Sequence, residues 1–167
     1  MGNHSISENT PVAIRRALEK DYAGFNLLFK QGDEYHASKA PDRFRPPLEP
    51  AREQSYFLSL LKDPTVGVFI AELNCELVGV LIVQVHDPIP PTHRPNRFVH
   101  VDSLVVREGY RRRGIGKALM AQADTWTLEQ GAIEMDLNVH AFNTDAISLY
   151  EKMGYQIVIH RMWKKMK

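Results

Sequence analysis

The chain has 167 residues, of which 44% are hydrophobic and 25% are charged, and its formal net charge is +1. This length suits one domain over residues 1–167, and the near-neutral charge gives no general electrostatic reason to bind nucleic acid or an anionic membrane. The single cysteine, Cys75, excludes a disulfide scaffold. No apolar run is long enough to span a membrane, and the N-terminus lacks a signal-peptide pattern, so we expect a protein of the reducing cytoplasm.

Hydrophobic periodicity divides the first half of the chain into short elements. Strands are expected at residues 12–17, 65–73 and 77–86, and helices at 19–32 and 51–62. The second and third strands form an antiparallel hairpin through the turn Asn74-Cys75-Glu76. Two proline-rich loops, 33–50 and 87–96, are either plain connectors or walls of the functional site, and we expect them to border that site.

The second half continues the alternation of strands and helices. Strands are expected at residues 97–106, 135–140 and 155–162, and helices at 114–130 and 143–153. Gly131 and Gly154 follow the two helices, as helix-stopping glycines commonly do. The order of elements is therefore β, α, α, β, β, β, α, β, α, β.

The junction between the strand at 97–106 and the helix at 114–130 is the most informative segment. A helix N-terminus offers unpaired backbone N–H groups and the positive end of the helix dipole. Gly114 and Gly116 allow a ligand to approach this backbone closely. Basic side chains surround it, namely Arg111, Arg112, Arg113 and Lys117. The segment predicts a site for a phosphate-bearing ligand and favours a pyrophosphate; the alternative is a solvated basic turn.

Two familiar phosphate loops do not match this segment. A P-loop would need Lys where Ile115 stands, and the dinucleotide fingerprint would need a third glycine where Leu119 stands. The pattern present is Arg/Gln-x-x-Gly-x-Gly/Ala, which resembles the acyl-CoA loop of the GNAT superfamily of N-acetyltransferases. In that family the pyrophosphate of acetyl-CoA lies on this turn. The resemblance therefore implies contacts to acetyl-CoA from Arg111, Arg112, Arg113, Gly114, Ile115, Gly116 and Lys117.

A second motif, in the C-terminal third, supports the resemblance. Asn143, Ala146, Tyr150 and Gly154 match the family pattern Asn-x-x-Ala-x-x-x-Tyr-x-x-x-Gly-Phe/Tyr. Asn143 is a good N-cap, and Tyr150 lies two helical turns further along the same face. The resemblance implies that Asn143 touches the pantetheine arm and that Tyr150 hydrogen-bonds or protonates the departing CoA sulfur. The alternative for Tyr150 is a tyrosine at the edge of the core.

The resemblance also implies the fold. It predicts a mixed α+β domain with a central, mostly antiparallel twisted sheet flanked by helices. In the family, the strand before the phosphate turn splays away from its neighbour. The backbone of Leu104, Val105 and Val106 would then hydrogen-bond the amides of pantetheine, as a peptide does at a sheet edge. A backbone N–H near Val105 would stabilise the oxyanion.

Acetyl transfer to an amine needs a neutral nucleophile, and an alkyl amine has a pKa of about 10.4, so a base or desolvation must help. His100 and Asp102 are two residues apart on the strand before the turn and are predicted to share a face. They fall where two branches of the family carry acidic residues, and neither is Glu, so both remain candidate bases. His140 is a third, weaker candidate.

The sequence thus predicts an acetyl-CoA-dependent N-acetyltransferase that transfers acetyl directly to a primary amine in a ternary complex, without a metal. The acceptor is a small amine, an antibiotic or a protein amine, and a second copy of the chain is a further candidate partner. The alternative is a non-catalytic acetyl-CoA-binding regulatory module, against which Tyr150 argues. A nucleic-acid binder ranks last, because the basic residues are confined to one turn and the C-terminal tail.

Overall fold

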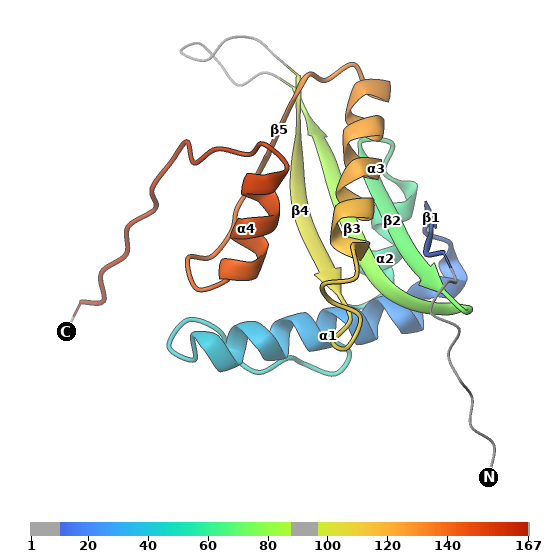
Figure 1. The fold of residues 1–167 in the computed structure, drawn as a ribbon. Coiled ribbons are helices and arrows are strands. Elements are labelled where there is room, and N and C mark those ends of the chain that lie inside the picture. The colour runs from blue at the N-terminus through green and yellow to red at the C-terminus, as the bar shows by residue number, and fades with distance from the viewer. Residues whose placement is uncertain (1–10, 88–96, 167) are drawn as a thin grey trace.

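A twisted five-stranded sheet forms the centre of the molecule (Figure 1). The computed structural model describes residues 11–87 and 97–166. The strands, which lie in the sheet in chain order, are β1 (Ala13–Arg16), β2 (Val66–Leu73), β3 (Glu76–His86), β4 (Phe98–Val106) and β5 (Glu134–Leu137). Neighbours are antiparallel except for β4 and β5, which are parallel. The expected mixed α+β fold with a mostly antiparallel sheet is confirmed.

Helices cover both faces of this sheet. They are α1 (Tyr22–Lys39, after the 3-10 turn Glu19–Asp21), α2 (Gln54–Lys62), α3 (Ile115–Glu129) and α4 (Thr144–Lys152). Strand β2 shows how alternation makes two cores: Val68 and Ile70 pack with α1 and α2, whereas Phe69 and Ala71 pack with α3. The molecule is therefore a three-layer arrangement, with α4 beside α3.

The α3 core is built around Trp126, which is 1% exposed. Its indole ring meets the edge of Phe69 at a centroid distance of 6.4 Å. Gly67 makes room for this pair, since a Cβ there would come within 2.8 Å of Phe69 and 3.1 Å of Trp126. A glycine in the middle of a buried strand thus follows from close packing.

A buried ionic cluster fixes the start of α1 to the sheet. The Asp21 side chain accepts hydrogen bonds from Arg15 at 2.7 and 2.9 Å and from the Leu18 amide at 2.7 Å. Arg15 also donates to Glu72 at 2.6 Å. The guanidinium of Arg15 lowers the pKa of Asp21 below its ordinary value. Because Asp21 is only 4% exposed, these partners offset the cost of burying its charge.

Several expected boundaries are wrong. The helix expected at 19–32 begins at Tyr22 and continues to Lys39, so it takes the first seven residues of the expected loop at 33–50. This stretch contains no proline before Pro41, so nothing in it stops the helix. Its residues have no strong helix propensity of their own, and the ion pair of Asp33 with Arg52 at 2.7 Å adds a tertiary contact that holds this part of the helix. The next helix starts at Gln54, three residues late, because the Arg52 backbone is already bonded to Asn26 and Tyr22.

Two further expectations concern the strands. The hairpin is confirmed, with a two-residue turn of Asn74 and Cys75 at φ 51° and 63°. The strand expected at 155–162 is absent: this described segment forms neither helix nor strand and runs away from the body (Figure 1). Residues 88–96 of the second expected loop lie outside the described residues. None of the helices in the described ranges combines the length and apolarity that a bilayer crossing requires.

Candidate active site

Strands β4 and β5 are paired only over the first part of β4. The parallel register joins Phe98 to Glu134 and ends where Val101 meets Leu137. The register of β4 with β3 shifts just after this point: Val101 faces Val83 but Ser103 faces Ile82, so Asp102 is an extra, bulged residue. Beyond the bulge β4 has no neighbouring strand on the β5 side within the described chain.

The hydrogen-bond pattern tells which backbone groups face this open edge. The amide of Arg107 donates to Val78 O at 2.9 Å, and in an antiparallel pair such bonds alternate along the strand. Val105 therefore directs its backbone groups to β3, and Leu104 and Val106 direct theirs to the open edge. The sequence expected all three to offer backbone groups; by this alternation the Val105 amide is engaged with β3. The Val106 carbonyl already accepts a bond from Arg111 Nε at 3.1 Å.

The turn between β4 and α3 has a backbone that side chains disfavour. Gly109, Arg112 and Gly114 have φ of 83°, 62° and 81°. Gly114 is the N-cap of α3 and carries no side chain that could bond the first amides of the helix. A Cβ built on Gly114 would have no heavy atom within 4 Å, so the space in front of the helix terminus is open. The amides of the first turn are thereby left to a ligand.

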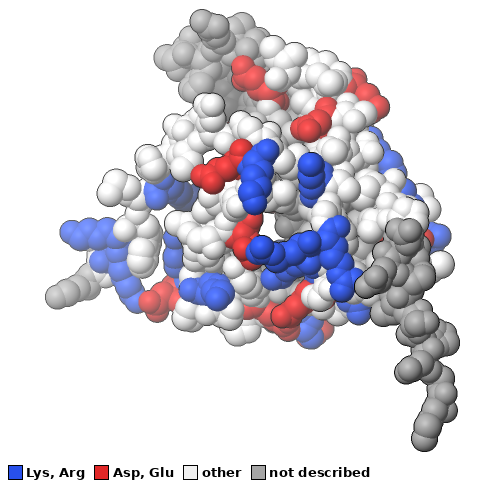
Figure 2. Space-filling view, in the orientation of Figure 1, with Lys and Arg blue, Asp and Glu red and all other residues white. Residues whose placement is uncertain are grey.

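Cationic side chains are gathered around this turn. Figure 2 shows Lys and Arg side chains on this face, around a small hollow. The guanidinium of Arg111 lies over the Tyr35 ring at 5.3 Å, and that of Arg113 lies over Tyr110 at 5.4 Å. Arg112 pairs with Asp145 of α4 at 3.2 Å, on the surface. With exposed Lys117 they supply the positive charge that a pyrophosphate needs beside a helix N-terminus.

Gly116 joins the phosphate turn to the second motif. A Cβ at Gly116 would come within 3.2 Å of the Leu149 side chain on α4, and it would reach Val106 and Leu104 at 3.9 and 4.0 Å. The missing side chain therefore lets the start of α3 approach α4 and β4. The structure gives this glycine a packing reason, in addition to the ligand approach that the sequence suggested.

The second motif lies next to this junction. Asn143 caps α4, as its position predicts, and its Oδ1 accepts a bond from the Ala146 amide at 3.4 Å. Tyr150 is 9% exposed and its ring lies 5.6 Å from that of Tyr155. Among the described residues its hydroxyl has no hydrogen-bond partner, and burial raises its pKa. A phenol in this state keeps its proton and can donate it to an incoming group.

Asp102 and His100 lie at the other end of the open edge, on the side of α1 and α2. Burial raises the pKa of the Asp102 carboxyl above its ordinary value, and the nearby His100 and His86 oppose this rise. Asp102 in turn helps to raise the pKa of Tyr56 on α2, after burial of that phenol itself. The bulge therefore holds an exposed aspartate whose carboxyl gains a proton more readily than an unperturbed one.

His100 is bound on both ring nitrogens by residues of and just after β5. Its Nδ1 lies 2.5 Å from Asp136 Oδ1, and its Nε2 lies 3.4 Å from the Asn138 amide nitrogen. Because a carboxylate accepts and an amide nitrogen donates, Nδ1 carries the proton and Nε2 accepts. The ring of His86 is oriented edge-on to that of His100, at a centroid distance of 6.2 Å. His100 thus ties β5 to β4 immediately before the strands part.

A cluster of aromatic and histidine rings joins α1 to the segment just before α4. His36 of α1 lies 5.3 Å from Phe44 and 5.6 Å from His140. His140 stacks on Phe142 with an interplanar angle of 3°. Burial, followed by the positive potential of His36, Arg43 and Arg161, lowers the pKa of His140. The lowered pKa favours the neutral form of His140, the weaker candidate base. Its imidazole, however, is packed against the rings of His36, Phe44 and Phe142.

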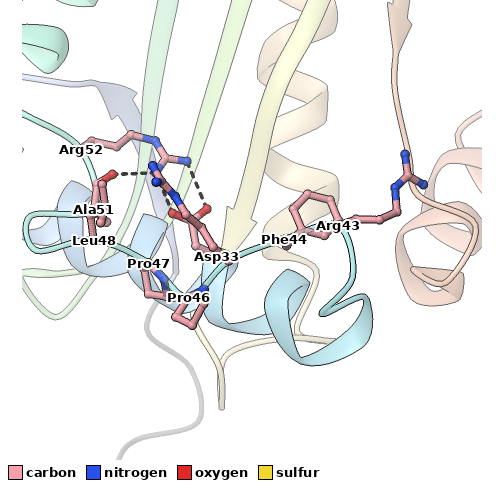
Figure 3. A pocket seen from close by; sticks show the side chains of 9 residues that line it. Asp33, Arg43, Phe44, Pro46, Pro47, Leu48, Ala51 and Arg52 are labelled. Atoms are coloured by element: carbon pink, nitrogen blue, oxygen red, sulfur yellow. Dashed lines mark hydrogen bonds and ion pairs between the residues drawn. The ribbon is translucent and has the colours of Figure 1, made fainter. Parts of the chain in front are cut away.

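A shallow hollow of about 270 Å³ lies beside Phe44, between the end of α1 and the loop that follows it (Figure 3). Its lining is rich in proline and arginine: Asp33, Arg43, Phe44, Arg45, Pro46, Pro47, Leu48, Ala51 and Arg52. The Arg52 guanidinium donates hydrogen bonds to the Asp33 carboxylate at 2.7 and 3.1 Å and lies 4.6 Å from the centroid of the Phe29 ring. These contacts fix the wall of the hollow. The second half of the expected loop therefore lines a concavity.

Sequence reasoning missed the side chains that complete this region, namely Tyr35, His36, Phe44, Tyr56, Asp136 and Phe142. Their roles depend on tertiary contacts between α1, α2 and β5, and no spacing in the sequence signals them. Asp136 is the exception, because it lies in the strand expected at 135–140, which the structure pairs with the strand of His100. Within the described ranges no group of three or more His, Cys, Asp or Glu residues could hold a metal ion.

A sheet that parts beside a cation-rich helix N-terminus is the arrangement of an acyl-CoA-binding fold. The sequence comparison agrees: the chain belongs to the acetyltransferase (GNAT) family, whose sequence model matches residues 30–155. The resemblance inferred from the two motifs is thereby confirmed.

Several curated relatives are named N-alpha-acetyltransferases, and others are named for ornithine or streptothricin acetylation. An N-alpha-acetyltransferase of Sulfurisphaera tokodaii is 34% identical over 108 residues, which is 62% of this chain and 64% of the relative. An N-alpha-acetyltransferase of Saccharolobus solfataricus is 31% identical over 107 residues, with the same coverage. The chain thus spans less than two thirds of the length of these relatives.

Solved structures share the fold. A tetramutant of the BH1408 protein from Bacillus halodurans has a TM-score of 0.86 and 24% identity, covering 92% of this chain and 99% of its own. The aminoglycoside N-acetyltransferase AAC(6')-Iy, solved in complex with CoA, has a TM-score of 0.71 and 16% identity, covering 93% and 99%. At these identities the likeness concerns the fold alone.

Proposed function

We propose that residues 1–167 form one N-acetyltransferase domain that transfers acetyl from acetyl-CoA directly to a primary amine in a ternary complex. One observation carries the proposal: a single open stretch of β4 runs from a cation-rich helix N-terminus to a carboxyl of raised pKa. The relatives named N-alpha-acetyltransferases support an α-amino group as the first acceptor to test.

The residues present suit acetyl-CoA. The free amides of α3, with Arg111, Arg112, Arg113 and Lys117, match a pyrophosphate in charge and in hydrogen-bond donors. The outward backbone groups of Leu104 and Val106 match the amides of pantetheine, which would pair with them as an added strand. The cosubstrate supplies a thioester, whose acyl carbon accepts the amine.

We assign the base to Asp102. During transfer the N–C bond forms, the C–S bond breaks, the amine loses a proton and the thiolate gains one. The Asp102 carboxylate attracts the cationic amine, which releases one proton to solvent before it attacks; Asp102 then accepts the second proton, directly or through water. The raised pKa brings this carboxyl closer to working pH than a solvated aspartate.

The other two predicted catalytic residues take separate roles. Tyr150 donates to the departing sulfur, because burial of the residue keeps its phenol protonated and its hydroxyl has no partner of its own among the described residues. His100 is a positioning residue: its contacts to Asp136 and Asn138 hold β5 at the point where the edge opens. An outward amide of Leu104 or Val106 stabilises the oxyanion.

The test is release of CoA thiol from acetyl-CoA with two acceptor pools, one of peptides with free N-termini and one of polyamines and aminoglycosides. We expect release with the peptides, and none from peptides whose α-amino group is blocked. Calorimetry with CoA runs in parallel. Binding without release in either pool would favour the non-catalytic module, and absence of binding would refute the assignment of the phosphate turn.

A further inference from the structure

The C-terminal part of α1 carries a tyrosine that lies against the phosphate turn. Helix α1 passes the end of β4 at Gly32 (Figure 1), since a Cβ on that glycine would meet the Val105 side chain at 3.6 Å. Tyr35 follows three residues later and therefore lies on about the same face of the helix. Its ring is partly buried, and its centroid lies 5.3 Å from the Arg111 guanidinium. The part of α1 that the sequence assigned to a loop thus contacts the first arginine of the turn.

Arg111 is held at two points, and its phosphate-binding groups stay free. Its Nε donates to the Val106 carbonyl at 3.1 Å, and its guanidinium lies over the Tyr35 ring, whose face attracts a cation. Arg112 pairs with Asp145, but Arg111 has no ion pair among the described residues. The two terminal nitrogens of Arg111 therefore remain available for the oxygens of a phosphate, which a guanidinium binds in fork geometry.

The place at which Arg111 is held suits the junction of pantetheine and pyrophosphate. Val106 is the last residue of β4, and its carbonyl faces the open edge to which the pantetheine arm is assigned. A guanidinium fixed at this carbonyl stands where that edge ends and the helix N-terminus of α3 begins. An arginine free in solvent would lose rotamer freedom on binding a ligand, and this loss lowers affinity. Two contacts made in advance reduce that loss.

Tyr35 uses its ring rather than its hydroxyl. The ring lies 6.2 Å from that of Phe142, just before α4, and the ammonium group of Lys39 lies 5.8 Å from its centroid. Among the described residues the Tyr35 hydroxyl makes no hydrogen bond. Removal of the hydroxyl alone should therefore leave the contact with Arg111 intact, whereas removal of the aromatic face should release the guanidinium.

We propose that Tyr35 is a positioning residue for the cosubstrate, whose ring holds the Arg111 guanidinium in the orientation that meets the pyrophosphate. The proposal rests on the proposed function, because it needs acetyl-CoA on this turn. Tyr35 acts through Arg111 and touches no reacting atom. Its loss should therefore raise the KM for acetyl-CoA and leave kcat unchanged.

Titration calorimetry with CoA tests the proposal through a double-mutant cycle of Tyr35→Leu and Arg111→Gln. Leucine is apolar and favours a helix, so Tyr35→Leu removes the aromatic face and keeps α1. We expect Tyr35→Leu to weaken CoA binding about ten-fold, and Tyr35→Phe to weaken it less than about two-fold because the ring remains. In the Arg111→Gln background, Tyr35→Leu should cause no further loss, because the guanidinium through which it acts is gone.

Phe44→Leu is the matched control. Phe44 belongs to the same cluster of rings, but it packs on His36 and His140 rather than on Arg111. This variant should keep its CoA affinity, and thermal unfolding of all variants shows that they are folded. Unchanged affinity in Tyr35→Leu, an equal loss in Phe44→Leu, or losses in Tyr35→Leu and Arg111→Gln that simply add would overturn the role of Tyr35 and leave the phosphate turn in place. If the unchanged chain binds no CoA, the proposed function fails as well.

Discussion

Gly114 and Gly131, at the two ends of α3, allow the phosphate turn to be tested without confusing binding with stability. Both have positive φ, 81° and 70°, and a Cβ on either would meet no heavy atom within 4 Å. The helix of 15 residues between them is about 22 Å long, so Gly131 lies far from the turn. The two glycines therefore share the same backbone strain and differ in their position relative to the proposed ligand.

Alanine at either position costs stability for the same reason. An L-residue held at this φ loses about 1–2 kcal/mol, which lowers the melting temperature by roughly 2–4 °C per kcal/mol in a chain of this size. Asparagine tolerates this conformation better, so Gly114→Asn and Gly131→Asn add side-chain bulk with a smaller loss of stability.

Only the Gly114 variants are expected to lose CoA binding. A side chain in the open space before α3 displaces the pyrophosphate from the first amides. Loss of two charge-assisted hydrogen bonds, at about 1.5 kcal/mol each, weakens binding roughly 100-fold. Titration calorimetry with CoA measures this, with thermal unfolding as the companion assay. Unchanged affinity in Gly114→Asn, or an equal loss in Gly131→Asn, would refute the reasoning.

Three further outcomes follow from single side chains. Tyr150→Phe should lower turnover about 100-fold with CoA affinity and stability nearly unchanged, because the hydroxyl has no described partner to lose; equal turnover removes it from the mechanism. Asp102→Asn should abolish the acidic limb of the kcat/KM profile, whereas Asp124→Asn, whose carboxyl pKa burial also raises, should keep it. Asp21→Asn should destabilise the fold by about 3 kcal/mol at neutral pH, measured by urea unfolding. Because the pKa of Asp21 is lowered, that contribution is present above its unfolded value and is lost as pH falls through the folded one, so the two proteins should converge in acid.

The order of strands and helices and the glycine-containing turn before α3 could be predicted from the sequence because both depend on local pattern. Alternation in residues 65–86 and helical spacing after Gly114 report which side chains are buried, and a helix N-terminus with glycines and arginines has the same chemistry in any fold. Gly114 adopts a positive φ, a conformation that favours a residue without a side chain, and a glycine at this position is visible in the sequence itself.

Where prediction failed, distant contacts decide the outcome. The residues of α1 after Gly32 carry no strong helical pattern, and Arg52 holds Asp33 from the segment just before α2. The tail after Gly154 has a clear strand pattern, yet a strand needs a partner, and the pattern cannot say which edge supplies it. Both errors are of one kind: the sequence states a preference, and the neighbouring segment determines whether it is realised.

The bulge at Asp102 shows how one residue can set both halves of the site. Without it, β4 would continue its alternation, and Val105 rather than Leu104 and Val106 would face the α3 core. With it, Val99 and Val101 before the bulge and Leu104 and Val106 after it all pack on that side. The strand thereby bends away from β5 while its core contacts persist, and the extra residue points a carboxyl toward α2. The open edge for the cosubstrate and the proposed base are thus consequences of the same insertion.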